Sequence, residues 1–370
     1  MKVRAAVLEH TGGLLEVQEL DLAPPGPAEV LVRLAASGVC HSDFNAIDGT
    51  AETRCPAVLG HEGAGVVEAI GPGVTRVGVG DHVALSWAPS CGSCGECLRE
   101  LPQLCSAAWP AMGTGGLMDG TTRLSRSGDP VYHYSFLSTF ADACVVPEKS
   151  CVPIPTDIPF AVAGLVGCAV TTGVGAVWRT AGVRPGDRVA IIGCGGVGLS
   201  ALMAAVAVGA EPVIAVDATA TKLDTARTFG ASDGVLWAGS AEATAEAIRD
   251  ASGGGVDYAI EATGRPEAMT AAFLSTRARG AAVLIGIPRE DAVLTLPALS
   301  IPRMERRVLG SIYGSSRPER DFGTTLALYQ AGRLPLDRLV SHHLPLEEVA
   351  RGFELMRSGE ALRVVLDLNA

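Results

Sequence analysis

The sequence predicts an α/β protein of two domains, one β-rich and one built on a doubly wound parallel sheet. Over residues 1–151, short apolar β-type runs alternate with Gly and Pro turns, which is typical of an irregular antiparallel domain. From about Arg188 onward, apolar strands alternate with helix-like segments, as in the right-handed βαβ units of an open parallel sheet. The final segment, from about Gly314, returns to mixed elements that can rejoin the first domain. A length of 370 residues suits this organisation.

Individual elements follow from apolar periodicity and from the turn residues that bound each run. Strands are expected at residues 3–8, 30–34, 66–70, 189–192, 213–216, 256–261 and 282–287, and helices at residues 198–208 and 222–229. Two uncharged stretches, residues 158–177 and 189–210, are long enough to be considered as membrane spans. Gly clusters interrupt both, and the second divides into a strand, a Gly turn and a helix, which is usual in a buried parallel sheet. We therefore expect no membrane association.

Composition narrows the class of protein further. Hydrophobic residues make up 48% of the chain and aromatic residues 5%, which is typical of a well-packed α/β protein and not of a disordered chain. A net charge of −11 without any basic block argues against nucleic-acid binding. The first residues lack the apolar core and cleavage site of a signal peptide, so we expect a cytoplasmic protein. Ten cysteines in that setting indicate metal binding or catalysis in place of a disulfide framework.

A glycine-rich loop follows the strand expected at residues 189–192. Its residues are Gly193, Cys194, Gly195, Gly196, Val197 and Gly198. Backbone N–H groups and the start of the next helix favour an anion such as a pyrophosphate there, although any tight strand-to-helix turn can carry such a string. The following strand leads into Asp217, whose carboxylate can bind ribose hydroxyls and repel a 2′-phosphate, so the pattern predicts NAD in preference to NADP. Lys222 is either a further ribose contact or a solvent-exposed helix lysine.

Four cysteines lie within fifteen residues on another Gly-rich loop: Cys91, Cys94, Cys97 and Cys105. Four thiolates complete a tetrahedral shell and leave no open position, so this spacing predicts a structural zinc ion. Chance clustering and an iron–sulfur cluster are the alternatives. No second cluster pattern and no Pro after the last Cys support the iron–sulfur interpretation.

A second set of metal-binding residue types is dispersed along the chain: Cys40, His61 and Cys168. Taken singly, a Cys is usually a small buried apolar residue, and a His is more often a hydrogen-bonded structural residue than a ligand. Together they offer two thiolates and one imidazole. This Cys2His set is typical of a catalytic zinc site, whose fourth position stays open for water or substrate.

These motifs resemble those of a known family, the zinc-containing medium-chain alcohol dehydrogenases, over essentially the whole chain. The resemblance rests on GHEGAGVVEAIGPGV at residues 60–74, the four-Cys loop, GLVGCAVTTGVGAV at residues 164–177, the Gly-rich loop with Asp217, and LRVVL at residues 362–366. DGTTRL and LSTF resemble the long form shared by vertebrate-type and glutathione-dependent formaldehyde dehydrogenases. The family implies a GroES-like catalytic domain at residues 1–169 and 313–370, a Rossmann domain at residues 170–312, NAD, and two zinc ions per chain.

The resemblance also implies a role for each matching residue. Catalytic zinc ligands fall on Cys40, His61 and Cys168, and structural zinc ligands fall on Cys91, Cys94, Cys97 and Cys105. Three further positions match residues close to the reaction in the family. Ser42 matches the hydroxyl that binds the alcohol oxygen, and Asp43 matches the carboxylate that orients the imidazole of the zinc-bound His. Glu62 matches an acidic neighbour of the zinc. Cofactor contacts outside the Gly-rich loop fall on His41, Thr172 and Arg363. Substrate-pocket positions fall on Trp87 and Tyr134, for which core packing is the alternative.

The implied activity is hydride transfer between NAD and a primary or secondary alcohol or its aldehyde. Asn45 occupies the position where many relatives place the His that ends a proton relay, and an amide cannot act as a general base at neutral pH. We therefore expect the proton to leave through Ser42, the nicotinamide ribose and water. Alternative functions are oxidation of an S-hydroxymethyl thiol adduct of formaldehyde and reduction of conjugated or imine substrates. A non-catalytic zinc protein is disfavoured because the catalytic ligands and Ser42 are intact.

Residues 307–313, RVLGSIY, form an apolar, β-prone segment at the end of the nucleotide-binding region. Relatives join two sheets edge to edge at this position, and an exposed strand edge is suited to such pairing. We expect a homodimer, or else a homotetramer, and a small-molecule alcohol or aldehyde as the substrate. An internal strand is the alternative for this segment.

Overall fold

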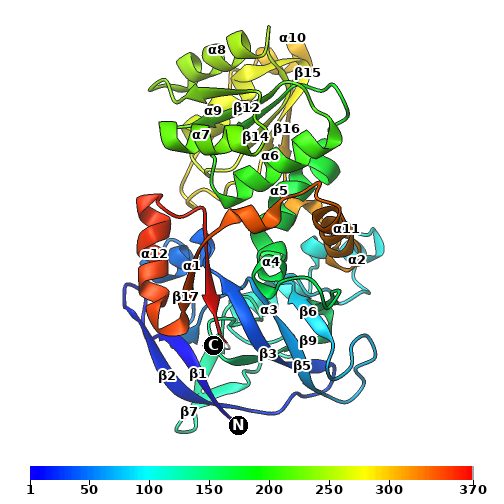
Figure 1. The fold of residues 1–370 in the computed structure, drawn as a ribbon, viewed down its shortest axis with the longest axis vertical. Helices are drawn as coiled ribbons and strands as arrows, with labels where there is room; N and C mark the ends of the chain where they lie inside the picture. The colour runs from blue at the N-terminus through cyan, green and yellow to red at the C-terminus, as the bar shows by residue number, and fades with distance from the viewer. Residues whose placement is uncertain (369–370) are drawn as a thin grey trace. The chain divides into compact units, whose positions relative to one another are not determined.

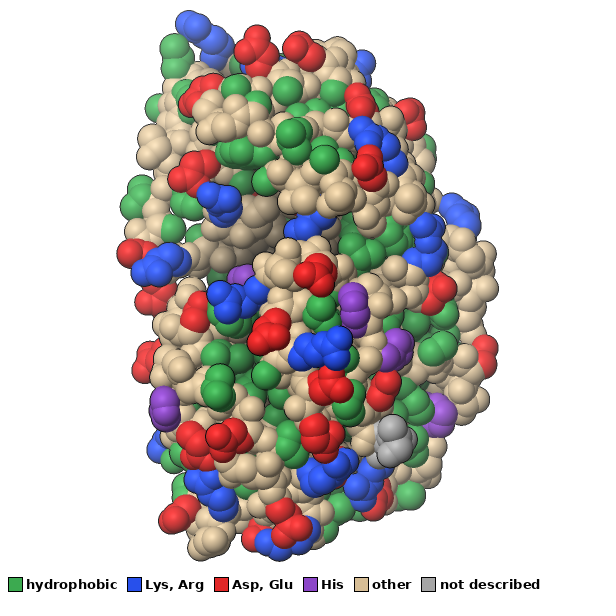
Figure 2. Space-filling model, turned by 60° about the vertical axis from the view of Figure 1, so that its left-hand side comes forward, with side chains coloured by type: hydrophobic (Ala, Val, Ile, Leu, Met, Phe, Trp, Pro, Cys, Tyr) green, Lys and Arg blue, Asp and Glu red, His purple; other side chains and the backbone are tan. Residues whose placement is uncertain are grey.

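The computed structural model describes residues 1–368, which form two compact units. The described part of unit 1 comprises Met1–Cys168, Arg317–Ala327 and residues 336–368, and unit 2 comprises Ala169–Ser316 and Leu328–Pro335. Figure 2 shows one face of the molecule, on which acidic and basic side chains are interspersed. No large patch of one charge covers this face.

Unit 1 is built on two β-structures (Figure 1). The first is a closed barrel, in the order β1 (Lys2–Leu8), β2 (Leu15–Leu22), β7 (Leu124–Arg126), β8 (Asp129–His133) and β4 (Ala57–Val58). The second is a sheet in the order β10 (Cys151–Pro153), β6 (His82–Leu85), β5 (Gly63–Ile70), β3 (Glu29–Gly38), β18 (Arg363–Asp367) and β17 (Val340–Pro345), with β9 (Ala143–Pro147) also paired to β3. The helices are α1 (His41–Asp48), α2 (Gly95–Leu98), α3 (Ala108–Gly113), α4 (Phe160–Leu165) and α12 (Val349–Ser358).

Strand β3 is the central strand of this second sheet. It pairs with β5, β9 and β18, and most of its residues are buried, as expected for a Val- and Leu-rich strand covered on both faces. Each fully buried Leu or Val, such as Leu34, contributes about 1.5–3 kcal/mol through removal from water. The pairing of β18 with β3 brings Val365 of the C-terminal segment beside Gly38, close in sequence to Cys40. The C-terminal segment therefore completes unit 1.

Unit 2 contains a six-stranded parallel sheet in the order β13-β12-β11-β14-β15-β16. Its strands are β11 (Val189–Ile192), β12 (Val213–Asp217), β13 (Asp233–Leu236), β14 (Val256–Glu261), β15 (Thr276–Leu284) and β16 (Arg307–Gly310). Its helices are α5 (Thr171–Gly175), α6 (Gly196–Val208), α7 (Ala220–Thr228), α8 (Ala241–Ala251), α9 (Pro266–Ser275) and α10 (Ser300–Met304), while α11 (Pro318–Gln330) begins in unit 1 and ends in unit 2. The parallel sheet confirms the predicted α/β class.

Several element boundaries differ from those expected by a few residues, and β15 and β16 are two of these cases. β15 begins six residues before the expected residue 282, because a bulge opposite β14 separates Thr276 from the regular pairing that resumes at Ala281. β16 ends at Gly310, short of residue 313, and Tyr313 itself has a left-handed φ of 53°, which no regular strand contains. The pattern of apolar residues located both strands. It could not locate these boundaries, because neither a bulge nor a left-handed residue changes that pattern.

One helical run, Phe160–Ala181, is long and apolar enough to cross a membrane by length and composition. It comprises α4 and α5 with π-helical turns at Val166–Val170 and Ala176–Ala181. In its most apolar window, 83% of the residues are buried inside the protein. Such burial is typical of a core helix, which needs the same apolar composition as a membrane span.

Candidate metal and nucleotide sites

Cys40 lies at the start of helix α1, where the chain leaves strand β3. Its backbone is extended, and its N–H donates to Oδ2 of Asp43 at 3.2 Å, so the helix begins with a side-chain cap. Gly49 ends the helix with a left-handed φ of 82°, which Gly adopts without strain. This short helix therefore holds Cys40, Ser42 and Asp43 in fixed register.

Asp43 connects helix α1 to His61. Its Oδ1 lies 2.9 Å from Nδ1 of His61 and accepts the N–H of Gly60 at 3.1 Å. Burial raises the pKa of this carboxyl, and the charge of His61 opposes the rise. Because Nδ1 of His61 is engaged by Asp43, Nε2 remains for a metal ion.

Four side chains meet beside this pair: Cys40, His61, Glu62 and Cys168. Their potential ligand atoms all lie within 4.8 Å of one another, and all four residues are buried. His61 and Glu62 directly precede β5, whereas Cys168 lies in the π-helical turn Val166–Val170. Gly167 lets this turn approach strand β6, because a Cβ there would lie 2.5 Å from the carbonyl oxygen of Leu85. The three dispersed residues that the sequence indicated are thus brought together.

The electrostatics of this cluster favour a cation. A hydrogen bond from Cys168 lowers the pKa of Cys40 well below its usual value, although burial opposes this, and the same bond together with burial raises the pKa of Cys168. Burial alone would lower the pKa of His61, but the charges of Asp43 and Cys40 raise it well above its usual value. Two buried sulfurs and one buried imidazole form a donor set that suits zinc, which displaces the protons of its ligands when it binds.

Arg363 lies against this cluster. Its guanidinium forms a buried ion pair with Oε2 of Glu62, and only 7% of the residue is exposed. Burial raises the pKa of Glu62 to about 7, and Arg363 opposes the rise. Nε of Arg363 has no hydrogen-bond partner among residues 1–368. The sequence indicated Arg363 as a cofactor contact and did not indicate its pairing with Glu62.

The remaining residues expected near the reaction lie on or beside α1. Ser42 and Asn45 are half-buried, and His41 is exposed. The hydroxyl of Tyr134 donates to the carbonyl oxygen of Ser42 at 2.8 Å, and its ring meets His61 edge-on at 5.7 Å between centroids. Tyr134 therefore lies directly at the metal-ligand cluster.

Trp87, the second expected pocket residue, is half-buried. It packs against the core of unit 1 and meets Trp109 edge-on at 6.3 Å between ring centroids. Core packing is thus part of its role, as the alternative interpretation anticipated.

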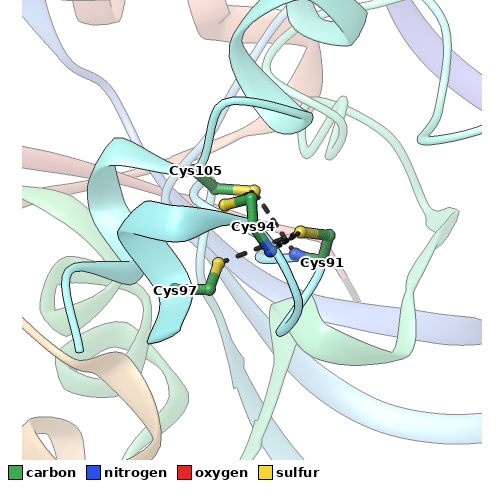
Figure 3. Close-up of side chains that lie close together, drawn as sticks. All are labelled: Cys91, Cys94, Cys97 and Cys105. Atoms are coloured by element: carbon green, nitrogen blue, oxygen red, sulfur yellow. Dashed lines mark hydrogen bonds between the residues drawn. The ribbon is translucent and has the colours of Figure 1, made fainter. Parts of the chain in front are cut away.

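The four-Cys loop folds into a second cluster (Figure 3). Sγ of Cys91 lies 4.0 Å from that of Cys97, and the sulfurs of Cys94 and Cys105 are 3.9 Å apart. A tetrahedral ion with metal–sulfur bonds of about 2.3 Å would place its ligands about 3.8 Å apart, so the arrangement fits zinc. The backbone N–H groups of Ser93 and Cys94 donate to Cys91, and these bonds lower its pKa to about 6.

In unit 2, the predicted Gly-rich loop joins β11 to α6. Gly193 and Asp217 line a cavity of about 110 Å³ together with Trp237, Thr263 and Arg265. Asp217 accepts the backbone N–H groups of Cys194 at 2.9 Å and Thr219 at 3.0 Å, which fixes its carboxylate at the end of β12. The cavity thus lies at the carboxyl edge of the parallel sheet, where such folds bind nucleotides.

Other expected contacts in unit 2 lie at several places. Gly195, Gly196, Val197 and Gly198 form the loop end and the first turn of α6, Lys222 is half-buried on α7, and Thr172 lies on α5. Sequence reasoning missed Trp237, Thr263 and Arg265. The last two lie in the segment just beyond the end of β14 at Glu261, so the rule that ligands bind beyond the carboxyl ends of parallel strands could have indicated them.

Comparison with known proteins agrees with this architecture. The family description "Alcohol dehydrogenase GroES-like domain" matches residues 26–156, and "Zinc-binding dehydrogenase" matches residues 196–331. The chain is 37% identical, over 99% of both proteins, to an NDMA-dependent alcohol dehydrogenase of Amycolatopsis methanolica. It is also similar to a crystal structure of an alcohol dehydrogenase zinc-binding domain protein from Burkholderia ambifaria, with a TM-score of 0.96, 34% identity and full coverage of both chains.

A further solved structure, the benzyl alcohol dehydrogenase of Acinetobacter calcoaceticus, aligns with a TM-score of 0.94 and 32% identity over 99% of both chains. These matches cover both units, including the two metal-ligand clusters and the cavity of unit 2. The GroES-like fold and the Rossmann-like fold predicted from the sequence are confirmed. The chain belongs to the zinc-binding alcohol dehydrogenase family of medium-chain dehydrogenases.

Proposed function

We propose that this alcohol dehydrogenase transfers a hydride between a primary or secondary alcohol, or its aldehyde, and NAD, at a zinc ion held by Cys40, His61 and Cys168. The observation that carries the proposal is the convergence of these three ligands in a buried cluster whose imidazole is oriented by Asp43. Three ligands leave a fourth position for substrate, which distinguishes this site from the closed four-Cys cluster. A second zinc ion in the latter would have a structural role.

The bound groups would supply Lewis-acid polarisation of the substrate oxygen and a hydride acceptor. The side chains of this chain set the environment. Asp43 holds His61 in one tautomer and orientation, and the pairing of Glu62 with Arg363 offsets the charge of a buried carboxylate close to the ligands. Ser42 carries the hydroxyl that would accept the substrate proton. Asn45 cannot serve as a base, so the side chain three residues beyond Ser42 would not take that proton further.

The fixed carboxylate of Asp217 supports NAD in preference to NADP, because it can bind ribose hydroxyls but repels a 2′-phosphate. The glycine loop and the start of α6 would hold the pyrophosphate, with Lys222 and Thr172 of the same unit as further contacts. One relative is named as NDMA-dependent. NDMA should therefore be tested as an electron acceptor beside free NAD. If the nicotinamide stays bound between turnovers, an external acceptor of this kind would have to reoxidise it.

Tyr134 beside His61 supports a small or flat alcohol as the substrate, and one structural relative is a benzyl alcohol dehydrogenase. The segments DGTTRL and LSTF, which resemble the long form of the family, support a thiol adduct of formaldehyde as the second candidate substrate.

For assembly, we propose a cytoplasmic homodimer, or a tetramer built from it, joined along β16. The support is that Leu299, Ile301 and Val308 near this edge strand are 62%, 41% and 39% exposed.

The test is a zinc count per chain together with a screen of aliphatic and aromatic alcohols. Each alcohol would be offered with NAD, NADP or NDMA as the acceptor, with and without glutathione and other low-molecular-weight thiols. About two zinc ions per chain and alcohol oxidation with NAD or NDMA are expected. Oxidation of formaldehyde only with a thiol would favour the second candidate. One zinc ion and no turnover with any acceptor would overturn the proposal.

A further inference from the structure

A turn of unusual backbone conformation lies beside the Cys40 cluster in unit 1. Ser135, Phe136 and Ser138 have φ values of 50°, 62° and 56°, a left-handed region that side chains other than Gly and Asn rarely adopt. Three such residues within four positions are costly. They persist only where surrounding contacts impose the conformation, and such strain is concentrated at functional sites.

Hydrogen bonds within the turn fix its shape. The N–H groups of Leu137 and Ser138 donate to the carbonyl oxygen of Tyr134 at 3.0 and 3.2 Å, and the N–H of Tyr134 donates to Oγ of Ser138 at 3.1 Å. Phe136, Leu137 and Ser138 are at most 1% exposed. The next residue, Thr139, donates its N–H to the carbonyl oxygen of Gly60 at 3.0 Å. The turn is thus attached to the residue that precedes His61.

The side chain that this turn presents is Tyr134. Its hydroxyl donates to the backbone oxygen of Ser42 at 2.8 Å, and its ring lies edge-on to His61. A carbonyl oxygen has two lone pairs, so Ser42 can accept this bond and still take part in helix α1. The following residue, Asp43, bonds to Nδ1 of His61. Tyr134 therefore contacts both helix α1 and the His61 ring, the same two parts that Asp43 joins by its hydrogen bond to His61.

We propose that the hydroxyl of Tyr134 is a positioning group, which fixes the first turn of α1, and with it the side chain of Ser42, relative to His61. The strained turn supplies the rigid support for this bond. Lining a pocket or filling the core would require only the ring, whereas the bond from the hydroxyl to a backbone oxygen requires tyrosine. The catalytic consequence rests on the function proposed for this site, but the structural consequence does not.

Tyr132 offers a matched control two residues away on strand β8. Its ring is half-buried, and the guanidinium of Arg54 lies 4.1 Å from the ring centroid. Within residues 1–368, the structure assigns the hydroxyl of Tyr132 no hydrogen bond. Tyr132→Phe therefore makes the same chemical change as Tyr134→Phe without removing a contact to α1.

The experiment measures hydrogen–deuterium exchange of the amides of α1 (His41–Asp48) in the full-length zinc-loaded protein and both variants. Loss of one hydrogen bond predicts exchange about 2- to 10-fold faster in Tyr134→Phe and unchanged exchange in Tyr132→Phe. For the active enzyme, kcat would fall by a similar factor with KM unchanged, because Ser42 is misplaced while the ring remains.

Unchanged exchange in Tyr134→Phe, or equal acceleration in Tyr132→Phe, would overturn the proposal. Faster exchange with unaltered kcat in an active enzyme would overturn the positioning role. If the wild-type protein oxidises no alcohol, the exchange measurement still decides whether the hydroxyl fixes α1. The failure of the proposed function and the failure of this inference are therefore distinguishable.

Discussion

Asp43 Oδ1 lies 2.9 Å from Nδ1 of His61, and both residues are at most 3% exposed. The carboxylate comes from helix α1 and the imidazole from the segment before β5, so the bond joins two elements of unit 1 at the candidate metal site. It also determines the tautomer, because a proton on Nδ1 leaves Nε2 as the donor to a metal ion.

Asp43→Asn tests the importance of this carboxylate. The amide oxygen can still accept the Nδ1 proton, but the negative charge that makes His61 a better metal ligand is lost. We expect zinc affinity at the Cys40 cluster to fall about 10- to 100-fold, as measured by competition with a chelator. Asp48→Asn at the exposed end of the same helix should leave the affinity unchanged. Equal affinity for both variants would show that Asp43 does not support the ligand.

Arg363→Met should destabilise the protein more than a typical surface substitution. It removes one member of the buried ion pair between Arg363 and Glu62, and such a loss costs about 3–5 kcal/mol of unfolding free energy. Arg351→Met, which removes an exposed pair with Glu348, should cost no more than about 1 kcal/mol. Urea unfolding of both variants measures the difference. Adding Glu62→Gln to Arg363→Met should recover part of the loss, and no recovery would contradict this explanation.

The sequence predicted different parts of this site to different extents. Cys40, His61 and Cys168 could be proposed because metal-ligand side chains carry chemistry that their residue types reveal. Arg363 and Glu62 are 301 residues apart, and only the pairing of β18 with β3 brings Arg363 to the site. No local pattern contains that information.

The left-handed turn was equally invisible in the sequence, because Ser135, Phe136 and Ser138 are not the Gly or Asn residues that normally mark such conformations. The parallel sheet, in contrast, was predicted correctly as a class. Its inner strands β11, β12 and β14 are apolar runs separated by helices, a pattern that depends on burial on both faces. The edge strand β13, with the sequence DGVL and partly exposed, was missed because it lacks that pattern.

His133 should make the protein less stable as the pH falls. Burial, and then the charge of Arg123, lower its pKa to about 3, against about 6.5 in an unfolded chain. Its Nε2 accepts the backbone N–H of Arg123 at 3.2 Å, which requires a neutral ring. Between about pH 6.5 and 3 the unfolded state therefore binds a proton that the folded state does not. Stability should fall through that window, by about 2 kcal/mol at pH 5.

The measurement is the unfolding free energy at pH 7 and pH 5 for wild type and His133→Gln. Glutamine can still accept the Arg123 N–H but does not titrate, so the variant should lose about 2 kcal/mol less than wild type over this interval. His10→Gln, at an exposed position, should behave as wild type does. Parallel pH dependence of wild type and His133→Gln would refute the assignment.

Cys105→Ser tests the identity of the ion in the four-Cys cluster. Removal of one thiolate opens the shell, so the zinc content should fall by about one ion per chain, with a marked loss of thermal stability. Cys55→Ser, outside both clusters, should retain the full zinc content. Iron and labile sulfide in the wild-type protein, with less than one zinc ion per chain, would instead support the iron–sulfur alternative.

Asp217→Ala should relax the preference for NAD over NADP. The carboxylate at the end of β12 borders the cavity of unit 2, and its removal takes away both the acceptor for the ribose hydroxyls and the charge that repels a 2′-phosphate. We expect the ratio of kcat/KM for NAD to that for NADP to fall at least about tenfold, which corresponds to about 1.4 kcal/mol. If the nucleotide stays bound between turnovers, the NAD content of the purified protein replaces this ratio as the measurement. Asp233→Ala, at an exposed position on β13, is the control, and an unchanged preference in Asp217→Ala would mean that another group selects the cofactor.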